Sequence, residues 1–363
     1  MTAATNRSGF RRQRGPAGPT VSAGYANNLM QFAIARGARR DELAMYSGIR
    51  VEDLEDPDNR VPFPRYVALM TASKQLCGDP SLALHLGAAQ DFKELSVVGL
   101  ICYAAPTMGE ALAELNRYGR LVAEVDVPGG DARFQIQPLG GNVWLVDTRR
   151  DPDSFPEMTE STWSRFIAET ARHFPDAAFA KAVHVTHAAP DHRAEYERVL
   201  KVPVTFRSDK NAILIDVSWL SIPLHNPNRY VFGVLSEHAD RLLNSLETAK
   251  TVRGLVESLL LPVLHKGDVS MEQVAKQLGM GRQSLYRRLT AEHVSYEHLV
   301  DDLRRRMALG YLSAKKASVN ETAYLVGFSD PSSFSRAFKR WTGASPRRWK
   351  ASGSPAPAGR KRR

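Results

Sequence analysis

The chain has only two cysteines in 363 residues, Cys77 and Cys102. Two thiols cannot build a four-cysteine zinc site, and they offer little material for structural disulfides. We therefore expect reduced thiols and a reducing compartment, the cytoplasm. The longest apolar run, residues 97–105, is far shorter than the roughly 20 residues that cross a bilayer. Since the N-terminus also lacks the apolar segment of a secretion signal, the sequence predicts no membrane contact.

Excess positive charge is missing from most of the chain, although the total is +10 with a pI near 9.6. Residues 15–250 hold 24 Lys and Arg against 30 Asp and Glu. Residues 251–363 hold 21 against 9, a net charge of +12, and the first fourteen residues add four arginines. Only the C-terminal part therefore has the charge distribution typical of nucleic-acid binding. The large acidic part needs another role, which argues against a purely architectural DNA binder.

A short helix with two unlike sides is predicted near the C-terminus, in "DPSSFSRAFKRWTG", residues 330–343. Asp330 suits the N-cap position, and the proline after it suits the first helical position. Phe334 and Phe338 recur at helical spacing and form an apolar stripe, and Gly343 ends the helix. The opposite side carries serines and cations. We expect one buried side and one basic, hydroxyl-rich side.

A second, shorter helix precedes this one and begins at a capping box formed by Ser318 and Glu321. The same order occurs earlier in the chain, where Ser270 and Gln273 form a capping box and a basic helix follows. Small residues lie five and nine positions after each capping serine, so the paired helices can cross closely. One such match is weak, but two in the same order favour DNA binding over a plain helical domain. Two helix-turn-helix units are predicted, at residues 270–290 and 318–342.

The segment between the units, residues 296–314, has an apolar stripe and a plausible N-cap at Ser295. As one helix it would span about 28 Å. Successive major-groove segments on one face of a duplex lie about 34 Å apart. A rigid connector of this length would let one molecule address two adjacent groove segments.

Residues 250–350 resemble the DNA-binding domain of the AraC/XylS class of bacterial transcription regulators, and "GFSDPSSFSRAFKRWTGASPRRW" is close to that class's signature. The resemblance implies that both recognition helices enter the major groove. Gly281 departs from the class, which often has a capping serine there, so we expect a looser helix start. For each arginine the alternative is a phosphate contact or a solvated charge. By position, the predicted DNA-contacting residues are Arg282, Gln283, Tyr286 and Arg287 in the first unit, and Ser332, Ser333, Ser335, Arg336 and Lys339 in the second.

The N-terminal part is predicted to mix helices with an antiparallel sheet, an α+β fold. Helices are expected at 22–38, 62–79, about 107–122, 156–173 and 191–199. A hairpin is expected around Gly140-Gly141, and further strands at 181–187, 203–206 and 212–216. "LSVVGLICYAAPTMGEALAELNRYGRL" and "ILIDVSWLSIPL" resemble the branch of the class that includes ornithine-utilisation regulators. That resemblance implies a ligand-sensing and self-associating domain, with ligand-binding residues unknown.

The predicted organisation is an α+β ligand-sensing domain followed by an all-α DNA-binding domain with two helix-turn-helix units joined by a linker helix. The interdomain helix carries an apolar stripe that would form either a dimer seam or a contact with its own domain. The predicted segments are a basic disordered tail (1–20), the sensing and oligomerisation domain (21–220), the interdomain helix (221–249), the DNA-binding domain (250–350) and a second basic disordered tail (351–363).

No catalytic residue, metal or cofactor is predicted. Neither cysteine has an adjacent His or Arg that would stabilise a thiolate, and an apolar setting raises the pKa of a thiol. His184 and His187 are three apart on a predicted strand, so they would point to opposite faces. The glycine-rich stretches lack the spacing of a phosphate loop. A DNA-binding domain fused to an enzymatic N-terminal domain is the alternative interpretation.

The sequence therefore predicts a ligand-responsive transcription activator of the AraC/XylS type that is not an enzyme. The expected partners are double-stranded promoter DNA, a small-molecule effector, RNA polymerase and a second copy of the chain. The expected location is the cytoplasm, on the nucleoid. The effector and the operator sequence cannot be read from these residues.

Overall fold

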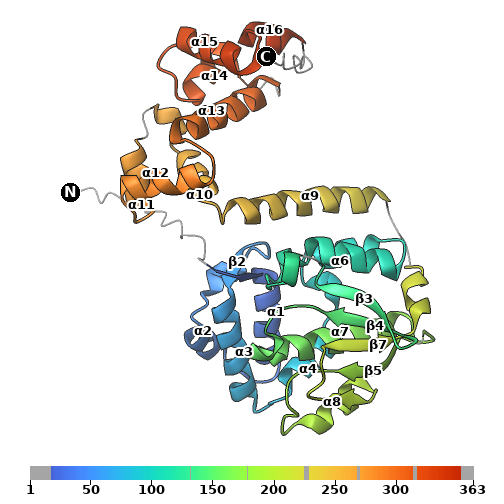
Figure 1. Cartoon of the computed structure of the whole chain (residues 1–363). Coiled ribbons are helices and arrows are strands. Elements are labelled where there is room, and N and C mark those ends of the chain that lie inside the picture. Colours follow the sequence, from blue (N-terminus) through green and yellow to red (C-terminus); the bar gives the residue numbers. More distant parts are fainter. Residues whose placement is uncertain are drawn as a thin grey trace. The chain divides into compact units, whose positions relative to one another are not determined.

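The structure, a computed structural model, describes residues 18–352 apart from 131, 178, 225–228, 268–269 and 314–316. The chain divides into two compact units, one formed by Pro16–Asn244 and one that contains Ser245–Arg363 (Figure 1). Of the two predicted tails, residues 1–17 and 353–363 lie outside the described residues.

The first unit combines helices with two small sheets, which confirms the α+β prediction (Figure 1). Its helices are α1 (Ala23–Ile34), α2 (Arg40–Ser47), α3 (Phe63–Cys77), α4 (Leu82–Ala89), α5 (Val97–Ala104), α6 (Met108–Val122), α7 (Pro156–His173), α8 (Arg193–Leu200) and α9 (Arg229–Thr248), whose last turn reaches the second unit. Its strands are β1 (Thr20–Ser22), β2 (Arg60–Pro62), β3 (Phe134–Leu139), β4 (Asn142–Asp147), β5 (Ala180–His184), β6 (Val204–Thr205) and β7 (Ala212–Ile215).

The larger sheet has the strand order β3-β4-β7-β5-β6. The predicted hairpin is present, because β3 and β4 pair antiparallel and turn through Gly140 and Gly141. Both glycines have positive φ, 58° and 77°, as a two-residue turn of this kind requires. The prediction of a purely antiparallel sheet is wrong, since β5 and β6 pair parallel. Helix α8 lies between these two strands in the chain, and a helical crossover returns the next strand in the same direction.

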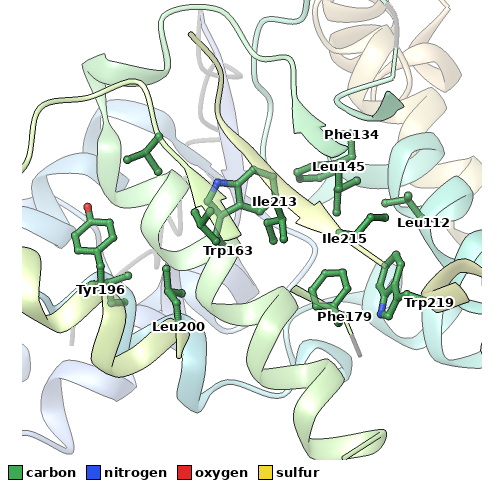
Figure 2. Packing of buried hydrophobic residues seen from close by; sticks show 13 residues of the cluster. Leu112, Phe134, Leu145, Trp163, Phe179, Tyr196, Leu200, Ile213, Ile215 and Trp219 are labelled. Atoms are coloured by element: carbon green, nitrogen blue, oxygen red, sulfur yellow. The ribbon is translucent and has the colours of Figure 1, made fainter. Parts of the chain in front are cut away.

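The core of this unit lies between α7, α8 and one face of the larger sheet (Figure 2). Trp163 of α7 lies 6.2 Å from Phe134 of β3 between ring centroids. Phe179 stacks on Trp219 at 4.6 Å, and Trp219 is 1% exposed. Leu145 faces this core, whereas its neighbours in β4 belong to a smaller cluster on the other face. The alternation along β4 is therefore that of a strand between two covered faces.

Thr20, which the sequence assigns to the disordered tail, instead begins β1 and is buried. Its backbone N–H and its hydroxyl donate to the Glu124 carboxylate at 3.1 Å and 2.8 Å, and its strand pairs with β2. These partners are distant in the chain, so no local pattern could indicate them. At the other end, α16 (Pro346–Ser352) extends two residues into the predicted second tail.

Within the first unit, α9 packs on α6 through a polar contact. Asp240 accepts hydrogen bonds from the Tyr118 hydroxyl at 2.9 Å and from Arg117 at 3.1 Å. Ala239 beside it is fully buried, and His238 lies 3.1 Å from the Asp58 carboxylate. The helix therefore contacts its own unit along this side, while a dimer seam elsewhere on α9 stays a prediction.

In the described part of the chain, the second unit consists of helices and a short 3-10 turn, in agreement with the predicted all-α fold. One hydrophobic cluster joins α10, α11, α12 and the first half of α13, and another joins the second half of α13 to α14 and α15. The elements are α10 (Val252–Leu260), η6 (Leu264–Lys266), α11 (Met271–Gln277), α12 (Arg282–Ala291), α13 (Tyr296–Ser313), α14 (Val319–Leu325), α15 (Pro331–Thr342) and α16.

Candidate nucleic-acid interface

Helices α11 and α12 form the first helix-turn-helix unit. The predicted capping box is present, with the Ser270 hydroxyl accepting from the Gln273 N–H at 3.3 Å and the Gln273 side chain accepting from the Ser270 N–H at 3.4 Å. Leu285 and Leu289 fix α12 to the core, being 0% and 1% exposed. Gly281 occupies the N-cap of α12 without a side-chain cap, as expected for glycine.

Helices α14 and α15 form the second unit, which is capped more strongly. Ser318 and Glu321 form the second capping box. The Asp330 carboxylate accepts from the Ser333 N–H at 2.8 Å, and hydrogen bonds from Ser333 hold the pKa of Asp330 below its usual value. Phe334 and Phe338 are both fully buried, with ring centroids 5.6 Å apart. The two phenylalanines therefore fix α15 and leave its opposite side to solvent.

The nine predicted contact residues all lie on α12 or α15, away from the buried stripes. Ser333 and Ser335 are half-buried, and Tyr286 is 61% exposed despite its large ring. An exposed tyrosine on a polar helix face is typical of a binding surface rather than of a core. The exposed members of the set are Arg282, Gln283, Tyr286, Arg287, Ser332, Arg336 and Lys339.

Two of the predicted arginine contacts already have protein partners. Arg282 pairs with Glu272 of α11 at 2.9 Å, but both side chains are exposed, so this pair is weak and open to exchange. Arg336 donates to the Ser333 hydroxyl at 3.0 Å, which directs its guanidinium toward the N-terminal end of α15. Sequence reasoning missed Glu272, although an acidic residue in the first turn of α11 is a usual helix-start signal.

Helix α13 is tied by ion pairs to α10 and to α15 of the second helix-turn-helix unit. In its first half, Asp302 accepts from Arg253 of α10 at 3.2 Å. Burial raises the pKa of Asp302, but its three arginine neighbours outweigh burial and hold this pKa below its usual value. Asp301 accepts from Arg340 of α15 at 2.7 Å and from the Trp341 indole at 3.3 Å. The cation of Arg340 is therefore turned toward α13. These acids on the linker had no signal in the sequence spacing.

A second contact, beside α13, joins η6 to the second helix-turn-helix unit. Gly327, in the turn before α15, has φ +86°, and an added Cβ there would lie 2.1 Å from the Leu264 carbonyl oxygen of η6. Arg304 of α13 donates to the Gly267 carbonyl at 2.8 Å and lies over the Phe328 ring, 5.1 Å from its centroid. Gly327 was expected to let α14 and α15 cross closely. It also allows the approach of η6, a contact that sequence reasoning missed.

The structure also describes the surroundings of the other residues considered for chemistry. Burial raises the pKa of both the Cys77 and the Cys102 thiol. His184 contacts the Ser208 hydroxyl at 3.0 Å, whereas His187 lies beyond the end of β5. Among the residues that the structure describes, no group of three His, Cys, Asp or Glu is arranged to hold a metal. The same residues include no helix long and apolar enough to cross a membrane.

Comparison with known proteins decides the family. Residues 37–224 match the family described as "Arabinose-binding domain of AraC transcription regulator, N-term", a match that covers more than half of the chain. The chain belongs to the AraC family of transcription regulators. A second match, to a "Helix-turn-helix domain", covers residues 274–352 and includes both recognition helices of this AraC-family protein.

The chain is similar to curated transcription regulators over most of their length. The chain is similar to the ornithine utilization regulator of Pseudomonas aeruginosa, with 26% identity covering 90% of this chain and 95% of the relative. It is also similar to the HTH-type transcriptional regulator VirS of Mycobacterium tuberculosis, with 27% identity covering 79% and 84%. The crystal structure of the regulator CdpR from Pseudomonas aeruginosa aligns at 23% identity and a TM-score of 0.39, covering 86% of this chain and 97% of that one.

The family assignment confirms the predicted class and its general function. This AraC-family protein regulates transcription and combines a ligand-binding N-terminal domain with a helix-turn-helix domain. The resemblance to the branch of ornithine-utilisation regulators, predicted from two segments of the first unit, is also confirmed.

Proposed function

We propose that this AraC-family protein is a ligand-responsive activator that places α12 and α15 in adjacent major-groove segments of promoter DNA. The observation that carries the proposal is the pair of capped helix-turn-helix units whose second helices expose polar and basic side chains. The 18 residues of α13 span about 27 Å, which is close to the spacing of about 34 Å between such segments.

In this proposal the contact residues divide by role. Side chains near the N-terminal ends of both recognition helices read base edges, and Lys339, further along α15, binds backbone phosphate. The residues assigned to base edges are Arg282, Gln283, Tyr286, Arg287, Ser332, Ser333, Ser335 and Arg336.

The remaining parts take the roles expected from the sequence. Residues 21–220 sense a small-molecule effector and self-associate, 221–249 connect the domains, and 250–350 bind DNA. A homodimer that recruits RNA polymerase, acting on the nucleoid in the cytoplasm, fits an activator of this family. The raised thiol pKa values of Cys77 and Cys102 support a sensing role over a thiol-dependent enzymatic one.

The test compares Arg336→Ala with Lys339→Ala in the full chain, since the two residues lie on one exposed side of one helix. Duplexes selected by the wild-type protein from a random pool serve as specific sites, and scrambled duplexes as controls, at several salt concentrations. Arg336→Ala should cost about 1–3 kcal/mol on the selected site and relax preference at one base pair. Lys339→Ala should weaken both duplexes alike and lower the salt slope by about one ion.

Equal losses on both duplexes for Arg336→Ala would show that this arginine contacts phosphate. Wild-type affinity that does not change between low and physiological salt would contradict the proposal that the basic residues of the +12 region bind phosphates.

A further inference from the structure

Helix α7 buries eight consecutive residues, Met158 to Arg165, of which six are polar or charged. A helix that is buried on every side is ordinarily apolar, because each buried polar group needs a partner. Three such atoms lack one among the described residues: the Glu160 Oε2, the Trp163 Nε1 and the Arg165 Nε atoms. Around α7, the interior of the first unit therefore contains buried polar atoms without a hydrogen-bond partner.

Two arginines of this interior are equally buried but differ in their partners. Arg149 and Arg165 are 7% and 9% exposed. Arg149 lies 3.9 Å from the Asp147 carboxylate, donates to the Pro152 carbonyl at 3.2 Å and bonds the Thr159 hydroxyl. Its charge is therefore matched by a buried acid, and its nitrogens have acceptors inside the protein.

Arg165 has no such compensation. It donates through Nη2 to the side-chain carbonyl of Gln90, a neutral group that is itself 5% exposed. Across the described part of the chain, no carboxylate forms an ion pair with it. Glu160, on the same helix, directs Oε1 to the Tyr196 hydroxyl and His192 instead. A buried cation without a counter-charge is costly, and proteins keep one mainly where function requires it.

Aromatic side chains line the guanidinium. Its carbon lies 5.6 Å from the centroid of the Tyr25 ring, which stacks on Tyr66 at 5.0 Å. Burial raises the pKa of the Tyr25 phenol. The charge of Arg165 and hydrogen bonds with Tyr66, Ser161 and Arg165 outweigh burial, so this pKa lies below its usual value. The positive charge of Arg165 therefore acts on the hydroxyl of the neighbouring Tyr25.

We propose that Arg165, Gln90 and Tyr25 form the effector site and that the effector is a small molecule with a carboxylate group. A carboxylate accepts paired hydrogen bonds from a guanidinium and supplies the negative charge that the site lacks. The proposal rests on the ligand-responsive function proposed above and names the chemistry of its ligand. The rings of Tyr25 and Tyr66 are aromatic neighbours of the guanidinium on which the rest of such a molecule could pack.

The first test measures thermal unfolding of the full chain by tryptophan fluorescence for Arg165→Met and Arg149→Met. Without ligand, Arg165→Met should change the melting temperature by about 2 °C or less, or raise it, because removal of the unmatched buried charge offsets the loss of its hydrogen bond to Gln90. Arg149→Met should lower it by about 4 °C or more, because its acceptors are left without a donor. Equal losses in the two variants would mean that Arg165 is a structural arginine and would overturn the proposal.

The second test adds short straight-chain fatty acids, benzoate and the protein amino acids to the apo protein, with each matching amide as a neutral control. At least one acid should raise the melting temperature of wild type and of Arg149→Met, but not of Arg165→Met. No shift with any acid, or equal shifts with acid and amide, overturns the site. DNA binding is measured separately, and Arg165→Met should bind the selected duplexes as wild type does. If the wild-type protein binds no DNA, the proposed function is wrong, whatever the result for the effector site.

Discussion

Replacing Gly327 by alanine tests the contact between η6 and the second helix-turn-helix unit. A left-handed backbone costs a residue with a side chain about 1–2 kcal/mol, and Gly327 has φ +86°. The new methyl would also lie 2.1 Å from the Leu264 oxygen, which already accepts from the Gly267 N–H at 3.1 Å. Overfilled space of this kind costs about 1–3 kcal/mol, so we expect Gly327→Ala to lower the free energy of unfolding by about 2–5 kcal/mol.

Gly343→Ala is the matched control, because Gly343 ends α15 with φ +78° but an added Cβ would meet nothing within 4 Å. It should cost only the backbone strain of about 1–2 kcal/mol. Urea unfolding of the full chain and of both variants, followed by circular dichroism, measures the difference. If the two variants lose equal stability, the close approach of Leu264 to Gly327 adds no cost to the substitution, and our reasoning about this contact is wrong.

Three further outcomes are expected. Phe334→Ala should destabilise the second unit by about 3–5 kcal/mol in urea unfolding, and binding to all duplexes should fall together rather than change preference. Asp147→Asn should cost about 3–5 kcal/mol, because it leaves Arg133 facing a neutral amide. Burial raises the pKa of Asp147, but Arg133 and Arg149 together lower it by more. The stability that these ion pairs contribute is therefore complete above about pH 4 and is lost as the pH falls through the lowered pKa. An unchanged acid limb in Asp147→Asn would contradict this. Replacing Cys77 and Cys102 by serine should leave DNA binding and regulation intact, and loss of an activity with the circular dichroism preserved would support the enzymatic alternative.

The sequence by itself determined the elements whose signals are local. A capping box needs two side chains three residues apart, and a buried stripe needs apolar residues at helical spacing. For that reason α11, α12, α14 and α15 were predictable, as were the β3–β4 hairpin and α7. The uneven charge and the family resemblance followed from the same printed residues. The choice of contact residues also came from position along the helix, and it stays a prediction.

Only the tertiary structure decided what depends on partners distant in the chain. The pairing of Thr20 with Glu124 and the parallel return of β6 through α8 have no local pattern. The same holds for the contact of Gly327 with Leu264. Most of all, the run "MTESTWSR" gives no sign that it is buried, since six polar residues in a helix normally face water. Whether a buried charge such as that of Arg165 is matched depends on which side chains the fold brings beside it, because Coulomb energy follows distance in space and not spacing in sequence.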